Sequence, residues 1–260
     1  MYLFLVCILF LCIPFTSFAS SIDVSSMTDE DLVTFIDSAQ AELNRRGALS
    51  SGSENNVTVA PGSIVAFGQY VQDNNGKEAS PIEWIVLDVV DNKCLIVSRV
   101  VIDAQPFNSV RADVTWETST LRKWLNNEFV QTAFSIEELT AIQSTHVSNA
   151  DNEGAADWSY DGGNDTEDKV FLLSYSECNK YFSSLSDWYT NPSEYAKSKG
   201  TYSSMENEYC SWWLRSKGNS SYTMLNVDDV NPVDHVMNRV VENPGGGIRP
   251  ALWLDLSALP

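Results

Sequence analysis

The chain has 260 residues, with 35 acidic and 16 basic side chains and a net charge of −19. A surface this acidic repels nucleic acid, and no cluster exceeds two adjacent basic residues, so a nucleic-acid partner is excluded. The length suits one sizeable domain with short flanking segments.

The first 19 residues form an uncharged apolar run that ends in small residues. This pattern is typical of a secretory signal peptide cleaved after Ala19, and Pro14 interrupts the run. The run lacks a basic start and is nearly as long as a membrane anchor, so its retention in a membrane is the alternative. We expect a secreted or cell-surface protein that contacts a membrane only if this segment is retained.

Residues 20–47 carry the signals of one separate N-terminal helix, with Thr28 as its cap and Gly47 after its last turn. Its narrow apolar stripe either docks weakly on the main domain or pairs with a partner helix. Residues 48–62 are small and polar, which predicts a linker.

Residues 63–260 alternate strand-like and helical segments, which predicts one α+β domain with a mixed or antiparallel sheet and a few short helices. Turn residues between the first three strands predict an antiparallel meander. Capping boxes predict helix starts at Ser135 and Ser174. The predicted strands are 64–70, 82–88, 93–98, 212–215, 222–227, 235–241 and 248–254. The predicted helices cover 116–126 and begin at 135, 174 and 191, with Pro192 in the first turn of the last one and Gly200 closing it.

Two aromatic runs near the C-terminus each contain one arginine, Arg215 and Arg249. Arginine is rarely buried unless its donors are paired, so we expect both to be structural anchors. In an alternating strand each arginine side chain points away from its apolar neighbours. Its guanidinium could then donate two hydrogen bonds to backbone carbonyls or to a carboxylate. The adjacent Trp212 and Trp213 are expected to belong to the same structural closure. Arg122 is either a third anchor or a surface charge.

Six short motifs follow one another along this domain: Phe67–Tyr70, Ile82–Leu87, Trp116–Asn126, Asp168–Ser174, Trp212–Ser216 and Ile248–Leu252. In this order they resemble an uncharacterised domain common in secreted and surface proteins of bacteria, over nearly all of 63–260. The resemblance implies export and a binding or structural role, without an assigned activity. The ending is also similar to the closing strands of C-type-lectin-like folds, which the formylglycine-generating enzyme and bacterial surface-binding domains share. A C-type-lectin-like fold is therefore expected.

The residues offer no recognisable catalytic set. The formylglycine-generating enzyme needs two neighbouring cysteines near the end of its chain, but here Cys210 has only Cys178 as a conceivable partner. There is no Gly-x-Ser-x-Gly elbow, and His146 and His235 have no triad context. Whether Cys178 and Cys210 form a disulfide or remain thiols with Cys94 stays open.

The stretch 149–168 is acidic, lacks periodicity and predicts a long loop. Asp161, Asp165 and Asp168 offer oxygen ligands of the kind that calcium prefers. A solvated insertion without a metal is the alternative. Apart from this weak calcium site, no cofactor is predicted.

Four aromatic residues lie in loop-like segments: Trp158, Tyr160, Trp188 and Tyr189. Exposed rings on loops over a rigid sheet are a common means of gripping sugars or peptides, whereas packing inside the loops is the alternative. The sequence therefore favours non-catalytic recognition of a glycan or protein at or outside the cell surface. A structural or interaction module is the second hypothesis, and an enzyme of unassigned chemistry is the third.

Overall fold

The computed structural model describes residues 28, 59–149, 160–204, 208–227 and 236–258. The expected signal peptide, the N-terminal helix apart from Thr28, and the linker as far as residue 58 lie outside the described residues. The main domain is one compact unit that begins at Thr58. Val59 packs against its core, and the Gly62 amide donates a 2.8 Å hydrogen bond to the Val86 carbonyl. The end of the predicted linker is therefore part of the domain.

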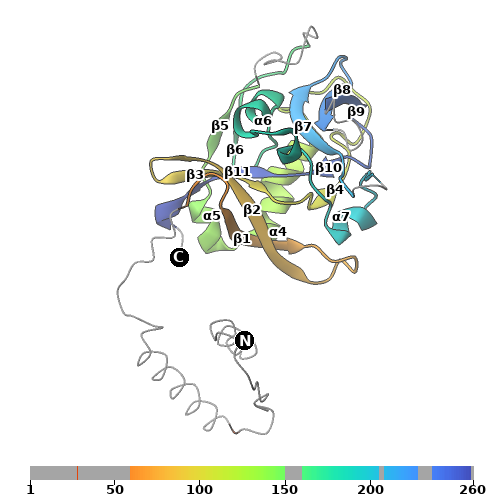
Figure 1. Ribbon diagram of the computed structural model, residues 1–260. Coiled ribbons are helices and arrows are strands. Elements are labelled where there is room, and N and C mark those ends of the chain that lie inside the picture. Colours follow the sequence, from red (N-terminus) through yellow and green to blue (C-terminus); the bar gives the residue numbers. More distant parts are fainter. Residues whose placement is uncertain (1–27, 29–58, 150–159, 205–207, 228–235, 259–260) are drawn as a thin grey trace. The chain divides into compact units, whose positions relative to one another are not determined.

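The first sheet contains four antiparallel strands in the order β1-β2-β3-β11 (Figure 1). Its first three strands confirm the predicted meander, and the last strand of the chain pairs with β3 at the edge of that meander. The strands are β1 (Ile64–Val71), β2 (Ala79–Val90), β3 (Lys93–Ser98) and β11 (Ala251–Asp255).

A second sheet has five strands in the order β4-β10-β7-β8-β9. Its pairs are antiparallel except β10 with β7, which are parallel. These strands are β4 (Asp103–Ala104), β10 (Gly247–Ile248), β7 (Trp212–Lys217), β8 (Thr223–Val227) and β9 (Val236–Val240). A two-stranded ladder joins β5 (Thr145–Val147) to β6 (Thr166–Asp168).

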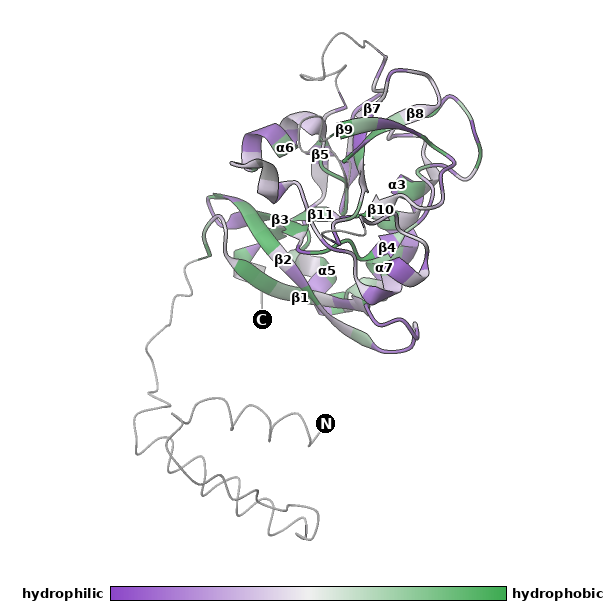
Figure 2. Ribbon diagram, turned by 45° about the vertical axis from the view of Figure 1, so that its right-hand side comes forward, coloured by the Kyte–Doolittle hydropathy of each residue, from purple (hydrophilic) through white to green (hydrophobic). Residues whose placement is uncertain are grey.

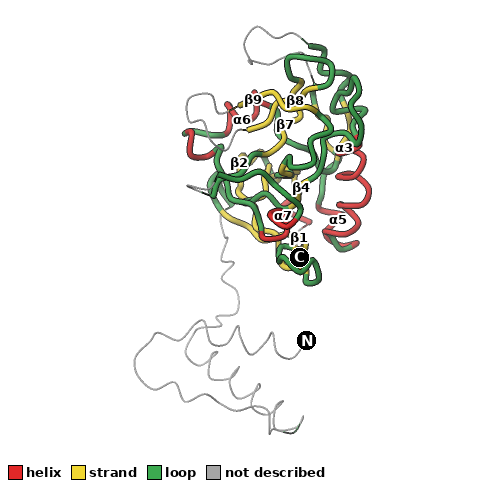
Figure 3. The backbone as a smooth tube through the Cα atoms, turned by 90° about the vertical axis from the view of Figure 1, so that its right-hand side faces the viewer, coloured by secondary structure: helices red, strands yellow, loops and turns green. Residues whose placement is uncertain are grey.

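Short helices flank the strands, so the architecture is α+β (Figure 3). A continuous helical stretch consists of α3 (Thr120–Trp124), a π-helical turn (Leu125–Phe129) and α4 (Val130–Ala133). The other helices are α5 (Ile136–Ala141), α6 (Tyr175–Tyr181), α7 (Glu194–Ser198) and the 3-10 turns η3 (Leu185–Asp187) and η4 (Leu256–Ala258). Figure 3 shows α3 and α5 on one side of the strands and α6 on the other.

The predicted capping boxes at Ser135 and Ser174 are both confirmed. In α6 the Ser174 hydroxyl accepts from the Glu177 amide, and the Glu177 carboxylate accepts from the Ser174 amide. The predicted start of α7 was wrong by two residues: Ser193 is its N-cap, and Pro192 precedes the cap. Pro192 instead forms an isolated β-bridge with Val101.

The predicted strand 248–254 is in fact two strands in different sheets. The chain leaves the five-stranded sheet after β10, passes through Arg249 and Pro250, and enters the four-stranded sheet as β11. Pro250 has no N–H to donate to a ladder, so the strand breaks there. Its carbonyl accepts a 2.9 Å hydrogen bond from the Ser98 amide, which fixes the corner against β3.

Large aromatic side chains fill the core, and their polar atoms are satisfied. Trp84, Trp116, Trp212 and Trp213 are fully buried. Their indole N–H groups donate to Phe67 O, Asp168 Oδ2, Trp188 O and Gln105 O, at 2.7 to 3.0 Å. Hydrophobic colouring runs along β1 and β2, whereas α6 and α7 are more hydrophilic (Figure 2). Buried side chains of the strands, the helices and the connecting loops together supply the apolar surface that holds the domain together.

Gly68 marks a bulge in β1 and cannot be replaced without strain. Its φ is +68°, and the ladder with β2 shifts register between Ala66 and Gln69. A Cβ at this position would lie 2.5 Å from the Phe134 ring. The Gly68 amide donates to the Glu138 carboxylate at 3.0 Å, which ties the bulge to α5.

The cysteines Cys94, Cys178 and Cys210 are buried and form no disulfide. The open alternative of a Cys178–Cys210 bond is therefore not realised in this structure. Among the described helices, none combines the length and the apolar character that crossing a membrane requires.

Candidate functional site

The structure describes three of the four aromatic residues that were predicted to recognise a ligand. Trp158 lies outside the described residues. Tyr160 is exposed, and Tyr189 stacks on the ring of Tyr209 with centroids 5.3 Å apart. Of the two alternatives for Trp188, exposure or packing inside the loops, the structure shows packing, because this side chain is only 3% exposed.

Trp188 is buried because residues from α6 and the segment after it cover the ring. Tyr175 and Phe182 pack on it, with centroids 5.8 and 5.5 Å away. Its carbonyl oxygen also accepts the Trp212 indole N–H. Trp188 thus belongs to the core beneath β7.

The three aspartates predicted as calcium ligands accept hydrogen bonds from within the chain. Asp161 accepts from the Gly163 amide, and Asp165 accepts from the Asn149 amide, which lowers the pKa of Asp165. Asp168 is buried. Within the described part of the chain, no group of three or more acidic, histidine or cysteine side chains is placed to hold a metal ion.

Asp168 is unsuited to metal binding because its oxygens are occupied. Oδ1 accepts from Arg122 Nε at 2.7 Å, and Oδ2 accepts from Trp116 Nε1 at 2.9 Å and from Thr166 Oγ1 at 2.7 Å. Arg122 also donates to the carbonyls of Glu117 and Glu167. Of the two alternatives left open for Arg122, the structure therefore shows the anchor.

Arg215 is a buried cation whose charge is neutralised within the domain. Its guanidinium forms a bidentate pair with the Glu177 carboxylate, through Nη1 and, at 2.9 Å, through Nη2. It also donates to Leu172 O at 2.8 Å and to Ser148 O at 3.1 Å. The expected alternation is absent here, because Trp212 to Arg215 are all buried and both faces of β7 are covered.

Arg249 is a buried cation of a different kind. The residue is 1% exposed, and its guanidinium lies between the rings of Phe182 and Trp212, 5.4 and 5.0 Å from their centroids. Nε donates to Ser98 O at 3.0 Å, and Nη1 makes a long contact of 3.4 Å with Asp187 O. Burial lowers the pKa of Arg249 to about 10, so it stays cationic at neutral pH.

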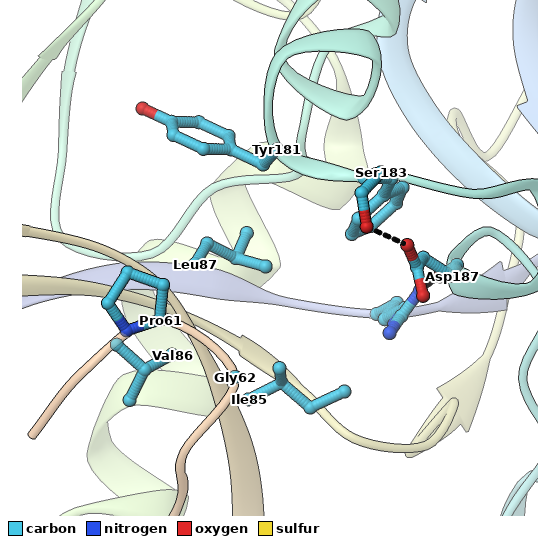
Figure 4. Close-up of a pocket in the computed structure, with 10 residues that line it drawn as sticks. Pro61, Gly62, Ile85, Val86, Leu87, Tyr181, Ser183 and Asp187 are labelled. Atoms are coloured by element: carbon cyan, nitrogen blue, oxygen red, sulfur yellow. Dashed lines mark hydrogen bonds between the residues drawn. The ribbon is translucent and has the colours of Figure 1, made fainter.

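A pocket of about 320 Å³ opens next to Arg249. Volumes of this order are typical of small-ligand sites. One side is aliphatic and polar groups lie opposite it, as Figure 4 shows for Leu87 and Ile85 facing Ser183 and Asp187. The lining residues are Pro61, Gly62, Ile85, Val86, Leu87, Tyr181, Phe182, Ser183, Asp187 and Arg249.

Local backbone features present these side chains. The ladder between β2 and β3 shifts register between Val86 and Asp88, so Leu87 sits at a bulge, a device that re-aims side chains. On the opposite side, Asp187 Oδ2 accepts from Ser183 Oγ at 3.1 Å and from the Ser184 amide at 2.8 Å. The pocket wall is thus held by its own hydrogen bonds.

The titratable groups of the pocket keep their ordinary charges. Burial raises the pKa of Asp187, but the hydrogen bonds from Ser184 and Ser183 outweigh it, so this pKa is lowered overall. Burial raises the pKa of Tyr181. At neutral pH the pocket therefore presents a carboxylate, a neutral phenol and the Arg249 cation, which suits binding.

A second, shallower hollow of about 440 Å³ lies at the C-terminal end of β2. Val90, Lys93, Gln143 and Trp253 are among its lining residues. It lacks a buried charge, so we consider the Arg249 pocket the stronger candidate.

A family model described as "Domain of unknown function (DUF6273)" matches residues 91–256. The chain belongs to this family. The matched DUF6273 region contains Tyr181, Ser183, Asp187 and Arg249, whereas the aliphatic side of the pocket precedes it. No curated protein and no solved structure matched the chain.

The sequence analysis of this DUF6273 chain identified Arg249 but missed the rest of the pocket. Tyr181 is the last residue of α6, and Ser183 and Asp187 follow it in a segment without periodicity. The Ser183-Ser184-x-x-Asp187 spacing, in which an aspartate accepts from preceding hydroxyl and amide groups, was the one local signal available. It indicates an ordered turn, and the sequence alone does not place that turn opposite β2.

Proposed function

We propose that this chain is an exported, non-catalytic recognition domain of C-type-lectin-like fold that binds a glycan or protein ligand at or outside the cell surface. The observation that carries the proposal is the pocket in which aliphatic side chains of β2 face Ser183, Asp187 and the buried Arg249 cation. The uncharged apolar residues 1–19 support export.

The charges of the pocket favour binding over catalysis. A general acid or base works best when its pKa lies near the operating pH. The pKa of Asp187 is lowered, that of Tyr181 is raised, and that of Arg249 is about 10. These groups are therefore suited to hold a ligand by fixed charge and hydrogen bonds.

The proposal is tested by binding of the full chain to arrays of glycans and of surface proteins, with two matched variants of β2. Leu87→Trp fills the Arg249 pocket, and Val90→Trp places the same side chain at the second hollow. We expect at least one ligand that binds the wild-type chain and Val90→Trp equally but does not bind Leu87→Trp. Ligands that bind Leu87→Trp undiminished would contradict the proposal.

A further inference from the structure

The Arg249 cation has no counter-ion in contact with it. Among the described residues, no carboxylate lies within ion-pairing distance of its guanidinium, whose hydrogen bonds go to the main-chain carbonyls of Ser98 and Asp187. The Asp187 carboxylate acts on the charge only from a longer distance. Buried charges in proteins are almost always paired, because removing an ion from water is costly. The lack of a counter-ion at Arg249 therefore indicates that an anionic ligand could pair with it.

The guanidinium is fixed and has a donor to spare. Two aromatic rings hold its plane, and Nε and Nη1 are engaged with the carbonyls. Nη2 makes no hydrogen bond within the described structure, and Arg249 is one of the residues that line the pocket. A cation held rigidly with an unpaired donor is a receptor for an anionic oxygen.

The remainder of the pocket restricts what accompanies that anion. Ile85, Leu87 and Pro61 provide an aliphatic surface. Opposite them lies the Asp187 carboxylate, which Ser183 Oγ and the Ser184 amide hold through Oδ2. The pocket therefore also favours a ligand N–H or O–H donor beside the anion.

Each aromatic ring that lines the pocket already has a cation over one face, which disfavours a stacked sugar. The Lys180 ammonium lies over the Tyr181 ring, 4.5 Å from its centroid. Phe182 packs edge to face against Trp188, and the Arg249 guanidinium lies over the Phe182 ring. Glycan sites usually present a free aromatic face.

We propose that the pocket binds the C-terminal carboxylate of a protein chain that ends in a short aliphatic residue. This inference rests on the proposed recognition function and names its ligand class. The carboxylate contacts Arg249 Nη2, the aliphatic side chain packs on Ile85 and Leu87, and the amide N–H of the terminal residue donates to the Asp187 carboxylate.

The experiment titrates three small molecules into the full chain by calorimetry: N-acetyl-L-valine, N-acetyl-L-valinamide and D-glucuronate. The first carries the proposed group, the second lacks only the carboxylate charge, and the third is an acidic sugar. We expect saturable binding of N-acetyl-L-valine, with the amide weaker by about tenfold to a hundredfold because a charge-assisted hydrogen bond is lost. Leu87→Trp abolishes this binding, and Val90→Trp leaves it unchanged.

Several outcomes overturn the inference. Equal binding of the valinamide would show that Arg249 does not receive the carboxylate. Tighter binding of D-glucuronate would assign the pocket to an acidic glycan. If none of the three compounds bound at millimolar concentration, the ligand class would be wrong, yet an array ligand lost only in Leu87→Trp would leave the recognition function standing. Because the comparison of acid and amide uses the wild-type chain, it does not depend on whether a variant of Arg249 folds.

Discussion

Arg215 and Arg249 occupy two similar aromatic runs and are both buried, yet their surroundings differ in one respect. Arg215 is neutralised by Glu177 and tied to two carbonyls, so its charge is paired within the domain. Arg249 is held by carbonyls and rings, and it lines a pocket without a carboxylate in contact, as far as the described residues extend. The comparison teaches that burial alone does not separate a structural arginine from a binding one. We propose that the presence or absence of a counter-ion separates them.

The largest loss of stability is expected when Arg215, the paired arginine, is replaced. Arg215→Met removes the cation that pairs with the Glu177 carboxylate and the donors to the carbonyls of Leu172 and Ser148. Removing one partner of a buried ion pair costs about 3 to 5 kcal/mol, so we expect a loss of that size in the free energy of unfolding. Urea denaturation measures it, and a loss below about 1 kcal/mol, the range of exposed ion pairs, would contradict the account.

A smaller effect is expected at a buried polar pair that contains no cation. The Tyr70 hydroxyl donates to Asp103 Oδ2 at 2.7 Å, and Asp103 is 4% exposed. Tyr70→Phe leaves a buried acceptor unpaired, so we expect a loss of about 1 to 3 kcal/mol by urea denaturation. Tyr160→Phe, at an exposed tyrosine, is the matched control and should change nothing.

The Tyr70→Phe effect should also depend on pH. Burial raises the pKa of Asp103, although the hydrogen bonds from Tyr70 and the Ala104 amide lower it in part. A carboxyl with a raised pKa in the folded state makes its most favourable contribution in acid, and loses it as pH rises from the unfolded pKa through the folded one. Without the Tyr70 hydroxyl this pKa rises further, so the variant loses more stability at neutral than at mildly acidic pH. An equal loss of stability at neutral and at mildly acidic pH would argue against a raised pKa of Asp103.

The same substitution at Arg249 tests the other arginine of the comparison. Arg249→Met removes hydrogen bonds to neutral carbonyls and also removes an uncompensated buried charge. We expect a stability loss of only about 1 kcal/mol together with loss of N-acetyl-L-valine binding. Should Arg249→Met destabilise the chain as much as Arg215→Met, the distinction between the two arginines fails.

The smallest effect on stability is expected at the solvent-exposed ion pairs of His146. His146 lies between Glu167 and Asp165, with nitrogen–oxygen distances of 3.0 and 3.2 Å, and is exposed. The hydrogen bond with Glu167 raises the pKa of His146. The stabilisation is therefore present below the unfolded pKa and is lost as pH rises through the folded pKa. A proton NMR titration checks the raised pKa, and His146→Gln should change the melting temperature slightly in acid and not at alkaline pH.

Local signals in the sequence predicted much of the fold. The capping boxes at Ser135 and Ser174 and the turns of the β1–β3 meander depend on neighbours within a few residues, so they could be recognised without the structure. The strand predicted over 248–254 failed because Pro250 separates two strands that pair in different sheets. Which sheet each half joins depends on β3 and β7, which lie far away in the sequence.

The candidate site depended almost wholly on such distant contacts. Trp188 lies in a loop-like segment, but Tyr175 and Phe182 bury it. The pocket combines β2, the segment after α6 and the corner at Arg249, and no local pattern brings these together. The sequence therefore predicted that Arg249 is buried, and the structure adds that no carboxylate of the described residues pairs with its charge beside the pocket.

The most direct test of the central claim follows the two guanidinium groups in one experiment. The full chain, labelled with ¹⁵N-arginine, is titrated with N-acetyl-L-valine, and the Nε–H signals of Arg249 and Arg215 are recorded by NMR. The account predicts that the Arg249 signal shifts in a saturable manner, while the signal of Arg215, whose Nη1 and Nη2 are paired with Glu177, does not move. An unmoved Arg249 signal, or equal shifts of both arginines, would contradict it.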